Sequence, residues 1–233
     1  MRAALLVLAT LAATSAGLVQ AQPARHPVVV ELFTSQGCSS CPPADAVLAD
    51  VARRRDVIAL ALHVDYWDYI GWKDTFGDPS FSQRQRDYAR ASGENMVYTP
   101  QMVVNGAEML MGADGDQLAH LLKRPDPTGR PDLIVTRQGD TLAVSATSSA
   151  ALPDGTMVQL VRYIPSAAVT IERGENAGRT ITYTNIVTSW QVAGTWDGRN
   201  PLAMALPARG DLPAVVIIQS PGPGAILAAA AVK

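Results

Sequence analysis

The chain has 233 residues, of which 48% are hydrophobic and 17% are charged, and its formal net charge is -2. This composition is that of a globular protein and excludes a disordered chain. The near-neutral charge provides no broad basic surface, so nucleic acid is not an expected partner.

The first segment, residues 1–21, has the pattern of a secretory signal peptide. Arg2 precedes an apolar run, and small residues follow up to Ala21. Polar residues break the apolar run, which is therefore too short to span a bilayer, and no stable membrane anchor is expected. We expect export, with a mature protein that is periplasmic or secreted and that works in an oxidising compartment.

The next part of the chain alternates strand and helix patterns. Apolar runs at 26–33 and 56–64 predict buried strands, and the segment that begins at Pro42 has helical spacing. Two buried strands that flank a helix predict a right-handed parallel crossover.

Further elements follow in the same region. Residues 78–93 predict a second helix, with a capping residue at the start and a glycine at the end. Asn105 and Gly106 lie between two short apolar runs, which is a strong β-hairpin signal. Residues 114–124 predict a third helix.

A break in the pattern follows at residues 123–132, which contain three prolines and a glycine. This composition predicts a linker at 125–131 between two domains, 26–124 and 132–233. The second of these contains short strand-like runs separated by turn signals. We expect it to be an all-β, sandwich-like domain.

Cys38 and Cys41 are the only cysteines, and they lie at the start of the first predicted helix. A helix N-terminus lowers the pKa of a thiol there, and the thiolate is the nucleophile of disulfide exchange. We expect Cys38 to attack and Cys41 to resolve the mixed disulfide. A bridge between them closes too short a loop to add much stability, which favours a chemical role. No organic cofactor is expected, because the redox-active disulfide carries the electrons.

A metal-binding alternative uses the same residues. Cys38, Cys41 and His63 together could hold a soft ion such as Cu(I). A closed zinc site needs four ligands, and the sequence has no second ligand pair. A non-enzymatic binding or copper-handling protein is therefore the alternative to an enzyme.

The strand, the Cys-x-x-Cys-Pro helix start and the pair Thr99-Pro100 ahead of the run "QMVVNG" together resemble the thioredoxin superfamily. The resemblance covers residues 28–123 and implies an α/β thioredoxin-like domain at 26–124. It also implies that Pro100 is cis and packs against the dithiol. Thr99 would then pair with a bound substrate strand.

Four segments, "ELFTSQGCSSCPPAD", "HVDYWDYIGWKDTF", "YTPQMVVNG" and "GENAGRT", also resemble the bacterial exported family known as domain of unknown function 1223. This resemblance spans both halves of the chain and implies no activity. It suggests that the loop 173–180 reaches the dithiol. Asn176 or Arg179 would then contact the substrate or the other domain.

Side chains that follow the second strand should lie beside the dithiol, because parallel strands end at the same edge of a sheet. His63 and Asp65 are in this position, and an aromatic segment comes next. Its large members are Tyr66, Trp67, Tyr69 and Trp72. These residues and Asp65 form either a platform that binds the substrate or a lid packed on the second domain.

Glu31 is a carboxylate in the first apolar strand. If buried, it would have a raised pKa and could relay protons to Cys41, as the buried acid of thioredoxin relatives does; at a sheet edge it would be solvated. The predicted catalytic residues are thus Cys38, Cys41, Pro100 and Glu31. The predicted function is thiol-disulfide exchange on a protein or small-thiol substrate, with a redox partner of unknown identity.

Overall fold

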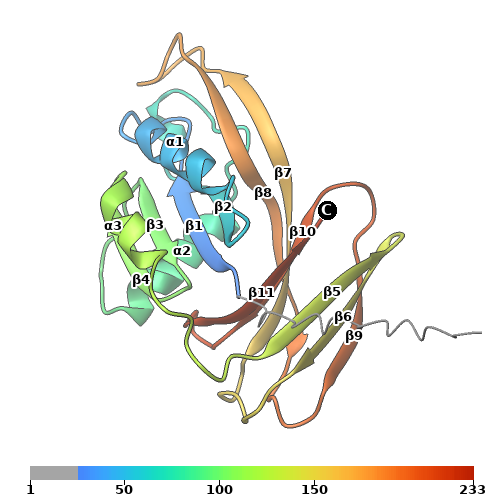
Figure 1. Ribbon diagram of the computed structural model, residues 1–233. Helices are drawn as coiled ribbons and strands as arrows, with labels where there is room; N and C mark the ends of the chain where they lie inside the picture. Colours follow the sequence, from blue (N-terminus) through green and yellow to red (C-terminus); the bar gives the residue numbers. More distant parts are fainter. Residues whose placement is uncertain (1–25) are drawn as a thin grey trace, which may run out of the picture.

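The computed structural model describes residues 26–233, so the predicted signal segment 1–21 lies outside the described residues. The described part is mostly β-structure (Figure 1). In chain order its elements are β1 (Val28–Thr34), α1 (Pro42–Val51), β2 (Val57–His63), the short 3-10 helix η1 (Asp68–Ile70), α2 (Pro79–Ala91), β3 (Gln101–Val104), β4 (Glu108–Met111), α3 (Gly115–Leu121), β5 (Asp132–Gln138), β6 (Thr141–Thr147), β7 (Met157–Thr170), β8 (Thr180–Thr195), β9 (Leu202–Pro207), β10 (Ala214–Gln219) and β11 (Ile226–Val232).

The helices begin where local chemistry favours a helix start. Pro42 occupies the first turn of α1, where a missing N–H costs no hydrogen bond. The side chain of Asp78 caps α2 by accepting from the Ser80 backbone N–H, at 2.8 Å. Asp114 caps α3 in the same way, accepting from Gln117. All three predicted helices are therefore present.

Most strands belong to one large sheet, in which the eight strands follow the order β11-β10-β7-β8-β2-β1-β3-β4. β1 and β2 are parallel and are joined through α1, which confirms the predicted crossover. β3 and β4 pair as the predicted hairpin, whose turn residues Asn105 and Gly106 both have positive φ.

The fold class predicted from the sequence is wrong. The prediction was an α/β thioredoxin-like domain followed by an all-β sandwich-like domain. Instead, one mixed sheet contains β1–β4 from the first half and β7, β8, β10 and β11 from the second. The two halves join where Ala61 of β2 pairs with Ile186 of β8. Apolar patterns identify strands but not the partners of their edges, so the sequence did not reveal this junction. The segment 125–131 lies between α3 and β5, and its role as a domain boundary stays a prediction.

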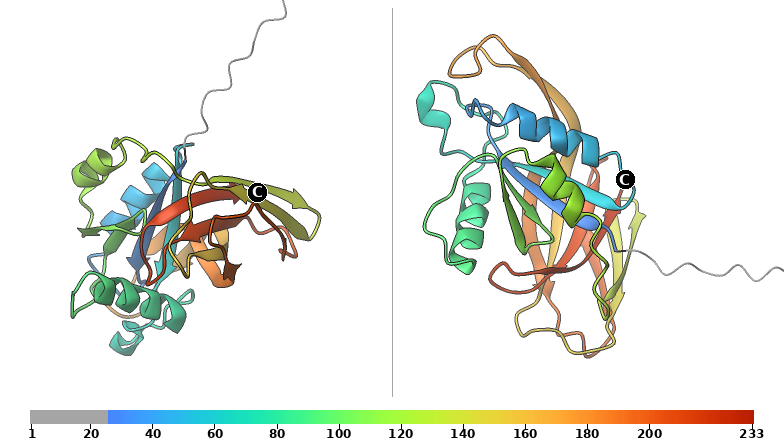
Figure 2. Two further views of the ribbon diagram at one scale, coloured as in Figure 1. Left: turned by 90° about the horizontal axis from the view of Figure 1, so that it is seen from below. Right: turned by 60° about the vertical axis from the view of Figure 1, so that its left-hand side comes forward.

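Helices cover both faces of the strands that precede the junction (Figure 2, left). α1 and α3 pack on one face, where Leu48 and Leu118 contact Val30 and Leu32 of β1. α2 packs on the other face, where Tyr88 meets Phe33. Because β1 is covered on both sides, its entire length except the first residue is buried.

The remaining strands, β5, β6 and β9, form a separate three-stranded sheet. This sheet packs on the far part of the large sheet, where Leu142 and Val144 meet Val216 and Ile218 of β10. The opposite side of β10 presents Val215 and Ile217 to the core beneath α2. Two-layer β packing is therefore present in the second half, but one layer is an extension of the first-half sheet.

The longest strands, β7 and β8, form a hairpin whose far end passes α1 (Figures 1 and 2). Residues 171–179 connect the two strands, and we call this segment the hairpin tip. The tip thus lies at the end of the molecule where α1 begins. Among residues 26–233, no helix is both long and apolar enough to cross a membrane.

Candidate functional site

The two cysteines form a disulfide directly before α1. The loop that contains them follows the C-terminal end of β1, and the Cα atoms of Cys38 and Cys41 are 5.4 Å apart. The exposed fraction is 1% for Cys38 and 0% for Cys41. The disulfide is therefore at a helix N-terminus, as predicted, but it is covered by surrounding residues.

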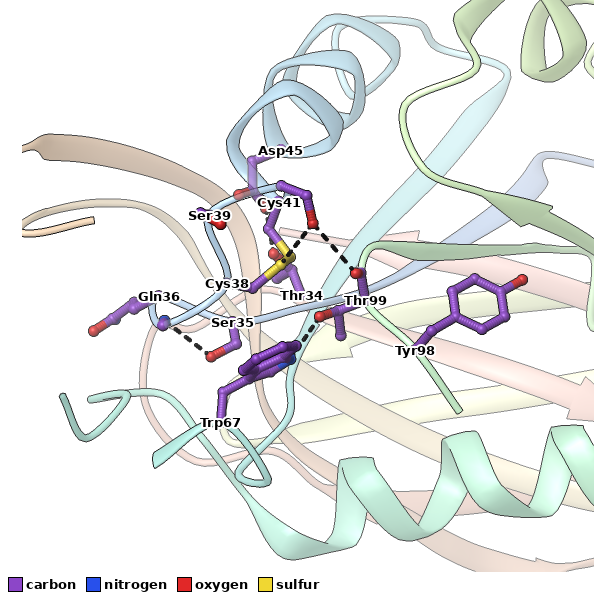
Figure 3. Close-up of a disulfide and its surroundings, with 12 residues drawn as sticks. Thr34, Ser35, Gln36, Cys38, Ser39, Cys41, Asp45, Trp67, Tyr98 and Thr99 are labelled. Atoms are coloured by element: carbon purple, nitrogen blue, oxygen red, sulfur yellow. Dashed lines mark hydrogen bonds between the residues drawn. A yellow bond between two sulfur atoms is a disulfide. The ribbon is translucent and has the colours of Figure 1, made fainter. Parts of the chain in front are cut away.

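Thr99 and its neighbours cover one side of the disulfide (Figure 3). The Ser40 hydroxyl lies 3.4 Å from Cys38 Sγ and donates to the Thr99 carbonyl oxygen at 3.5 Å. Trp67 Nε1 donates to Thr99 Oγ1 at 2.7 Å. The Thr99–Pro100 peptide bond is cis, as expected. Thr99 and Trp67 are therefore linked to the loop of the disulfide, whereas the packing of Pro100 against the dithiol stays a prediction.

A buried carboxyl group lies one helical turn after Cys41. Asp45 is four residues further along α1, so the two side chains share a face of the helix. The Thr34 hydroxyl donates to Asp45 Oδ1 at 2.9 Å, whereas Asp45 Oδ2 has no hydrogen-bond partner among residues 26–233. Burial raises the pKa of Asp45 from 3.8 to about 6, although the nearby His63 opposes this increase. Asp45 can therefore hold or release a proton near neutral pH.

A histidine–aspartate pair lies buried beneath the cysteine loop. His63 Nδ1 and Asp74 Oδ2 are 2.8 Å apart, and both side chains have no exposed surface. The same Asp74 oxygen accepts from the backbone N–H of Gln36 at 2.8 Å. His63 also contacts the rings of Phe76 and Tyr183 edge-on. This pair ties the segment after β2 to the loop that carries the disulfide.

The aromatic segment after β2 is partly bonded and partly free. Trp72 Nε1 donates to the Gln36 side chain at 2.8 Å, and the Tyr66 hydroxyl donates to Gln85 at 3.0 Å. Burial raises the pKa of Tyr66 to about 12. Tyr69, in contrast, is 81% exposed and stacks on Trp67. The segment is therefore anchored at both ends and presents one tyrosine to solvent beside the disulfide.

Two predicted site residues lie away from the sulfur atoms. Asp65 accepts a hydrogen bond from the Ser82 hydroxyl of α2. Glu31 is fully buried, but it faces α2, on the side of β1 opposite to α1. There it pairs with Arg84 through two hydrogen bonds, of 2.6 and 3.0 Å. The buried acid next to the disulfide is Asp45, which the sequence analysis missed.

The sequence contained a signal for Asp45. Cys41, Asp45 and Leu48 are spaced i, i+4 and i+7, which places all three on the buried face of α1. An acidic residue in the first turn is also typical of a solvated helix start, so the spacing alone does not single out Asp45. Asp74 had no signal, because it lies in an irregular loop.

The hairpin tip reaches the cysteine loop from the other half of the chain. Asn176 Nδ2 donates to the carbonyl oxygens of Gln36 and Cys38, both at 2.9 Å. The neighbouring Glu175 accepts from the backbone N–H of Ser39 at 3.3 Å. The expectation that the loop 173–180 reaches the dithiol and that Asn176 contacts the other half of the chain is therefore confirmed.

The metal-binding alternative needs Cys38, Cys41 and His63 to converge. Within residues 26–233, no three His, Cys, Asp or Glu side chains form a group that could hold a metal ion. His63 directs Nδ1 to Asp74, and the two sulfur atoms bond to each other.

A cavity of about 700 Å³ lies near the other end of β1 and is lined by Val28, Leu122 and Ile226, among others.

The fold and the site together define a mostly β protein in which a buried Cys-x-x-Cys disulfide lies at the C-terminal end of β1. Residues 29–219 match the family model described as protein of unknown function (DUF1223). The chain belongs to this family, as the sequence resemblance suggested.

A solved structure matches most of this chain. A crystal structure of a protein from Agrobacterium tumefaciens has 33% sequence identity and a TM-score of 0.75, with 88% of this chain and 93% of that chain covered. A hypothetical protein from Pyrococcus horikoshii OT3 matches at 12% identity and a TM-score of 0.24, over 49% of this chain and 96% of its own. No curated protein matches this chain.

Proposed function

We propose that this protein is an exported thiol-disulfide oxidoreductase that uses the Cys38–Cys41 pair. The observation that carries the proposal is the pair's position at the N-terminus of α1, with the buried carboxyl group of Asp45 one turn further on. The helix start favours a thiolate at Cys38, and Asp45 can exchange a proton with Cys41. The local arrangement of dithiol, helix and Thr99 also resembles that of the thioredoxin superfamily.

The proposed reaction conserves atoms and electrons. In the reduced protein, the Cys38 thiolate attacks a substrate disulfide, a mixed disulfide forms, and one substrate sulfur leaves as a thiolate. Cys41 then gives up its proton and attacks Cys38 Sγ, which re-forms the protein disulfide and releases the second substrate thiolate. Two electrons pass to the substrate. A dithiol from the redox partner reduces the pair again, and each step is reversible.

Asp45 is the proposed proton acceptor for Cys41. Its Oδ2 has no partner in the described part of the chain, whereas Oδ1 accepts from Thr34, so one oxygen is available for a proton. A pKa of about 6 lets the carboxylate form act as a base at neutral pH and the acid form return the proton. Glu31 is not suited to this role, because Arg84 and Tyr88 occupy its oxygens.

The proposed substrate, a protein or a small thiol, would approach past the exposed side chains beside the disulfide. Ser39 and Ser40 are exposed, and Tyr69 presents its ring on top of Trp67. The secretory pattern of residues 1–21 supports a periplasmic or secreted location, and the near-neutral charge gives no support for nucleic acid as a partner.

The test is catalytic turnover in insulin reduction, with dithiothreitol as the electron donor. Wild type should accelerate the reaction, Cys38→Ser should abolish the acceleration, and Cys41→Ser should accumulate a mixed disulfide that is visible on a non-reducing gel. Absence of turnover, together with stoichiometric retention of Cu(I) by the reduced protein, would contradict the proposal and support copper handling instead.

A further inference from the structure

The hairpin tip is a preformed element of the second half of the chain. Gly178 N–H donates to the Ile171 carbonyl at 2.7 Å, and Ile171 N–H donates to the Arg179 carbonyl at 2.9 Å. Gly174 and Gly178 both have positive φ, which only glycine adopts readily. The tip therefore has backbone hydrogen bonds of its own that define its turn.

Asn176 connects this tip to the disulfide. Its side chain is 1% exposed, and Arg179 donates to its Oδ1 at 2.9 Å, which fixes the orientation of the amide. Nδ2 then donates to Gln36 O and Cys38 O, so every strong hydrogen-bonding group of the amide is used. Two hydrogen bonds thus hold this buried side chain against the backbone of the cysteine loop, and a third, from Arg179, orients it.

Glu175 brings a negative charge to the same place. Its Oε2 accepts from the Ser39 N–H. This N–H is one of the backbone donors ahead of α1 that have no partner within the helix and that would otherwise favour a thiolate at Cys38. The tip also packs on the aromatic segment, since a Cβ added at Gly174 would lie 3.3 Å from the Cβ of Trp72. The second half of the chain therefore contacts both the dithiol loop and the residues beside it.

We propose that Asn176 is a positioning residue for the dithiol, and that the hairpin tip sets the stability of the Cys38–Cys41 disulfide relative to the two thiols. This inference rests on the proposed function. By fixing the Cys38 backbone, Asn176 keeps the two sulfur atoms at a high effective concentration relative to each other. Glu175 destabilises the Cys38 thiolate and so also favours the disulfide.

The first test is the equilibrium of the protein with a glutathione buffer, in which two glutathione molecules reduce the disulfide and leave as one glutathione disulfide. Asn176→Ala should shift this equilibrium about tenfold toward the dithiol, which is about 30 mV for a two-electron couple. Asn176→Asp, which replaces the donating amide with an acceptor facing two carbonyl oxygens, should shift it in the same direction.

Asn185→Gly is the matched control. Asn185 lies on the same hairpin and also donates from its side chain to a first-half carbonyl, that of Ala59, but at the β2–β8 junction. Glycine tolerates the positive φ at this position. This variant should lower the free energy of unfolding without moving the glutathione equilibrium. A shift equal to that of Asn176→Ala would overturn the proposal, because it would reflect general destabilisation.

The second test is the pH profile of Cys38 alkylation by iodoacetamide in the reduced protein. Glu175→Gln should move the midpoint to lower pH and speed alkylation at pH 7 by about threefold, with a smaller effect in high salt. Glu172→Gln removes an equal exposed charge from the same loop and should change nothing. If Glu175→Gln leaves the alkylation profile unchanged and a folded Asn176→Ala protein leaves the glutathione equilibrium unchanged, the proposal is overturned. The hairpin tip would then be only a packing contact.

These measurements do not depend on catalysis. If wild type shows no insulin turnover but Asn176→Ala moves the glutathione equilibrium, the proposed function fails and the positioning role stands. If turnover is found and the equilibrium does not move, the positioning role fails and the proposed function stands.

Discussion

A buried acid lies at each face of β1, and the two acids differ in how many of their oxygens are hydrogen-bonded. On the α2 face, the Glu31 carboxylate is paired with Arg84 at 2.6 Å and also accepts from the Tyr88 hydroxyl at 2.6 Å. On the α1 face, Asp45 has one oxygen bonded to Thr34 and one without a partner. A buried carboxylate with all its oxygens bonded is fixed in place and costly to leave unpaired, whereas a buried acid with a free oxygen is suited to proton transfer.

The Glu31 face carries a network that joins both halves of the chain. Arg84 also donates to Gln219 of β10, and Gln219 in turn donates to the Tyr88 hydroxyl at 2.9 Å. The Arg84 guanidinium stacks 3.7 Å from the ring centroid of Trp190 on β8. This network therefore links β1 and α2 of the first half to β8 and β10 of the second half.

The largest expected effect comes from breaking this network. Glu31→Gln leaves Arg84, whose side chain is 11% exposed, without its carboxylate, and should lower the free energy of unfolding by about 4 kcal/mol. Urea unfolding at pH 7 measures the loss. Glu108→Gln breaks the half-exposed pair with Arg124 and should cost about 0.5 kcal/mol. Equal losses in the two variants would refute the contrast between buried and exposed pairs.

The raised pKa of Asp45 should make the free energy of unfolding depend on pH. The pKa of about 6 lies above the value of 3.8 for a free aspartate, so the folded state holds this proton more tightly than the unfolded chain. The contribution to the free energy of unfolding is full below the unfolded pKa of 3.8 and falls by about 3 kcal/mol as pH rises through 6, since one pKa unit is 1.36 kcal/mol.

Asp45→Asn removes the group that titrates. From pH 4 to pH 7, the free energy of unfolding of the variant should therefore rise relative to that of wild type. The neighbouring side chains of His63 and Asp74 are present in both proteins, so their contributions largely cancel in the difference. Urea unfolding of both proteins at each pH gives the curve. A flat difference would show that Asp45 has an ordinary pKa.

The same substitution should slow the chemistry. In Asp45→Asn the resolving attack by Cys41 lacks its proton acceptor, and the reduction of glutathione disulfide by the reduced protein should slow about 100-fold. Rapid quenching with acid measures the rate. Asp50→Asn changes an exposed aspartate of the same helix and should leave the rate unchanged. A normal rate in Asp45→Asn would show that solvent or another group accepts the proton of Cys41.

The elements of the first half could be predicted because each depends on local pattern. Pro42 starts α1, Asp78 caps α2, and Asn105 with Gly106 forms the turn between β3 and β4. The Cys-x-x-Cys spacing likewise identified the disulfide. Long-range pairing has no such local signature, and the sequence therefore did not show that β8 would extend the sheet beside β2.

The side of β1 that each acid occupies was also beyond the sequence. Period-two alternation separates Glu31 from Thr34 on the strand, but only the packing of α1 and α2 decides which face meets the disulfide. The resemblance to thioredoxin relatives directed attention to the strand acid, whereas the acid beside Cys41 comes from the helix. Asn176 was found because its loop is part of a family segment.

The smallest expected effect concerns the hydrogen bond from Thr34 to Asp45. Thr34→Val keeps the volume but removes the donor to Asp45 Oδ1, so that oxygen also loses its partner. The carboxylate form loses a hydrogen bond worth about 1 kcal/mol, which should raise the pKa of Asp45 further. The fall in stability should then extend to higher pH than in wild type. If it does not, the Thr34 hydroxyl does not determine the charge state of Asp45, and the free oxygen alone distinguishes this acid from Glu31.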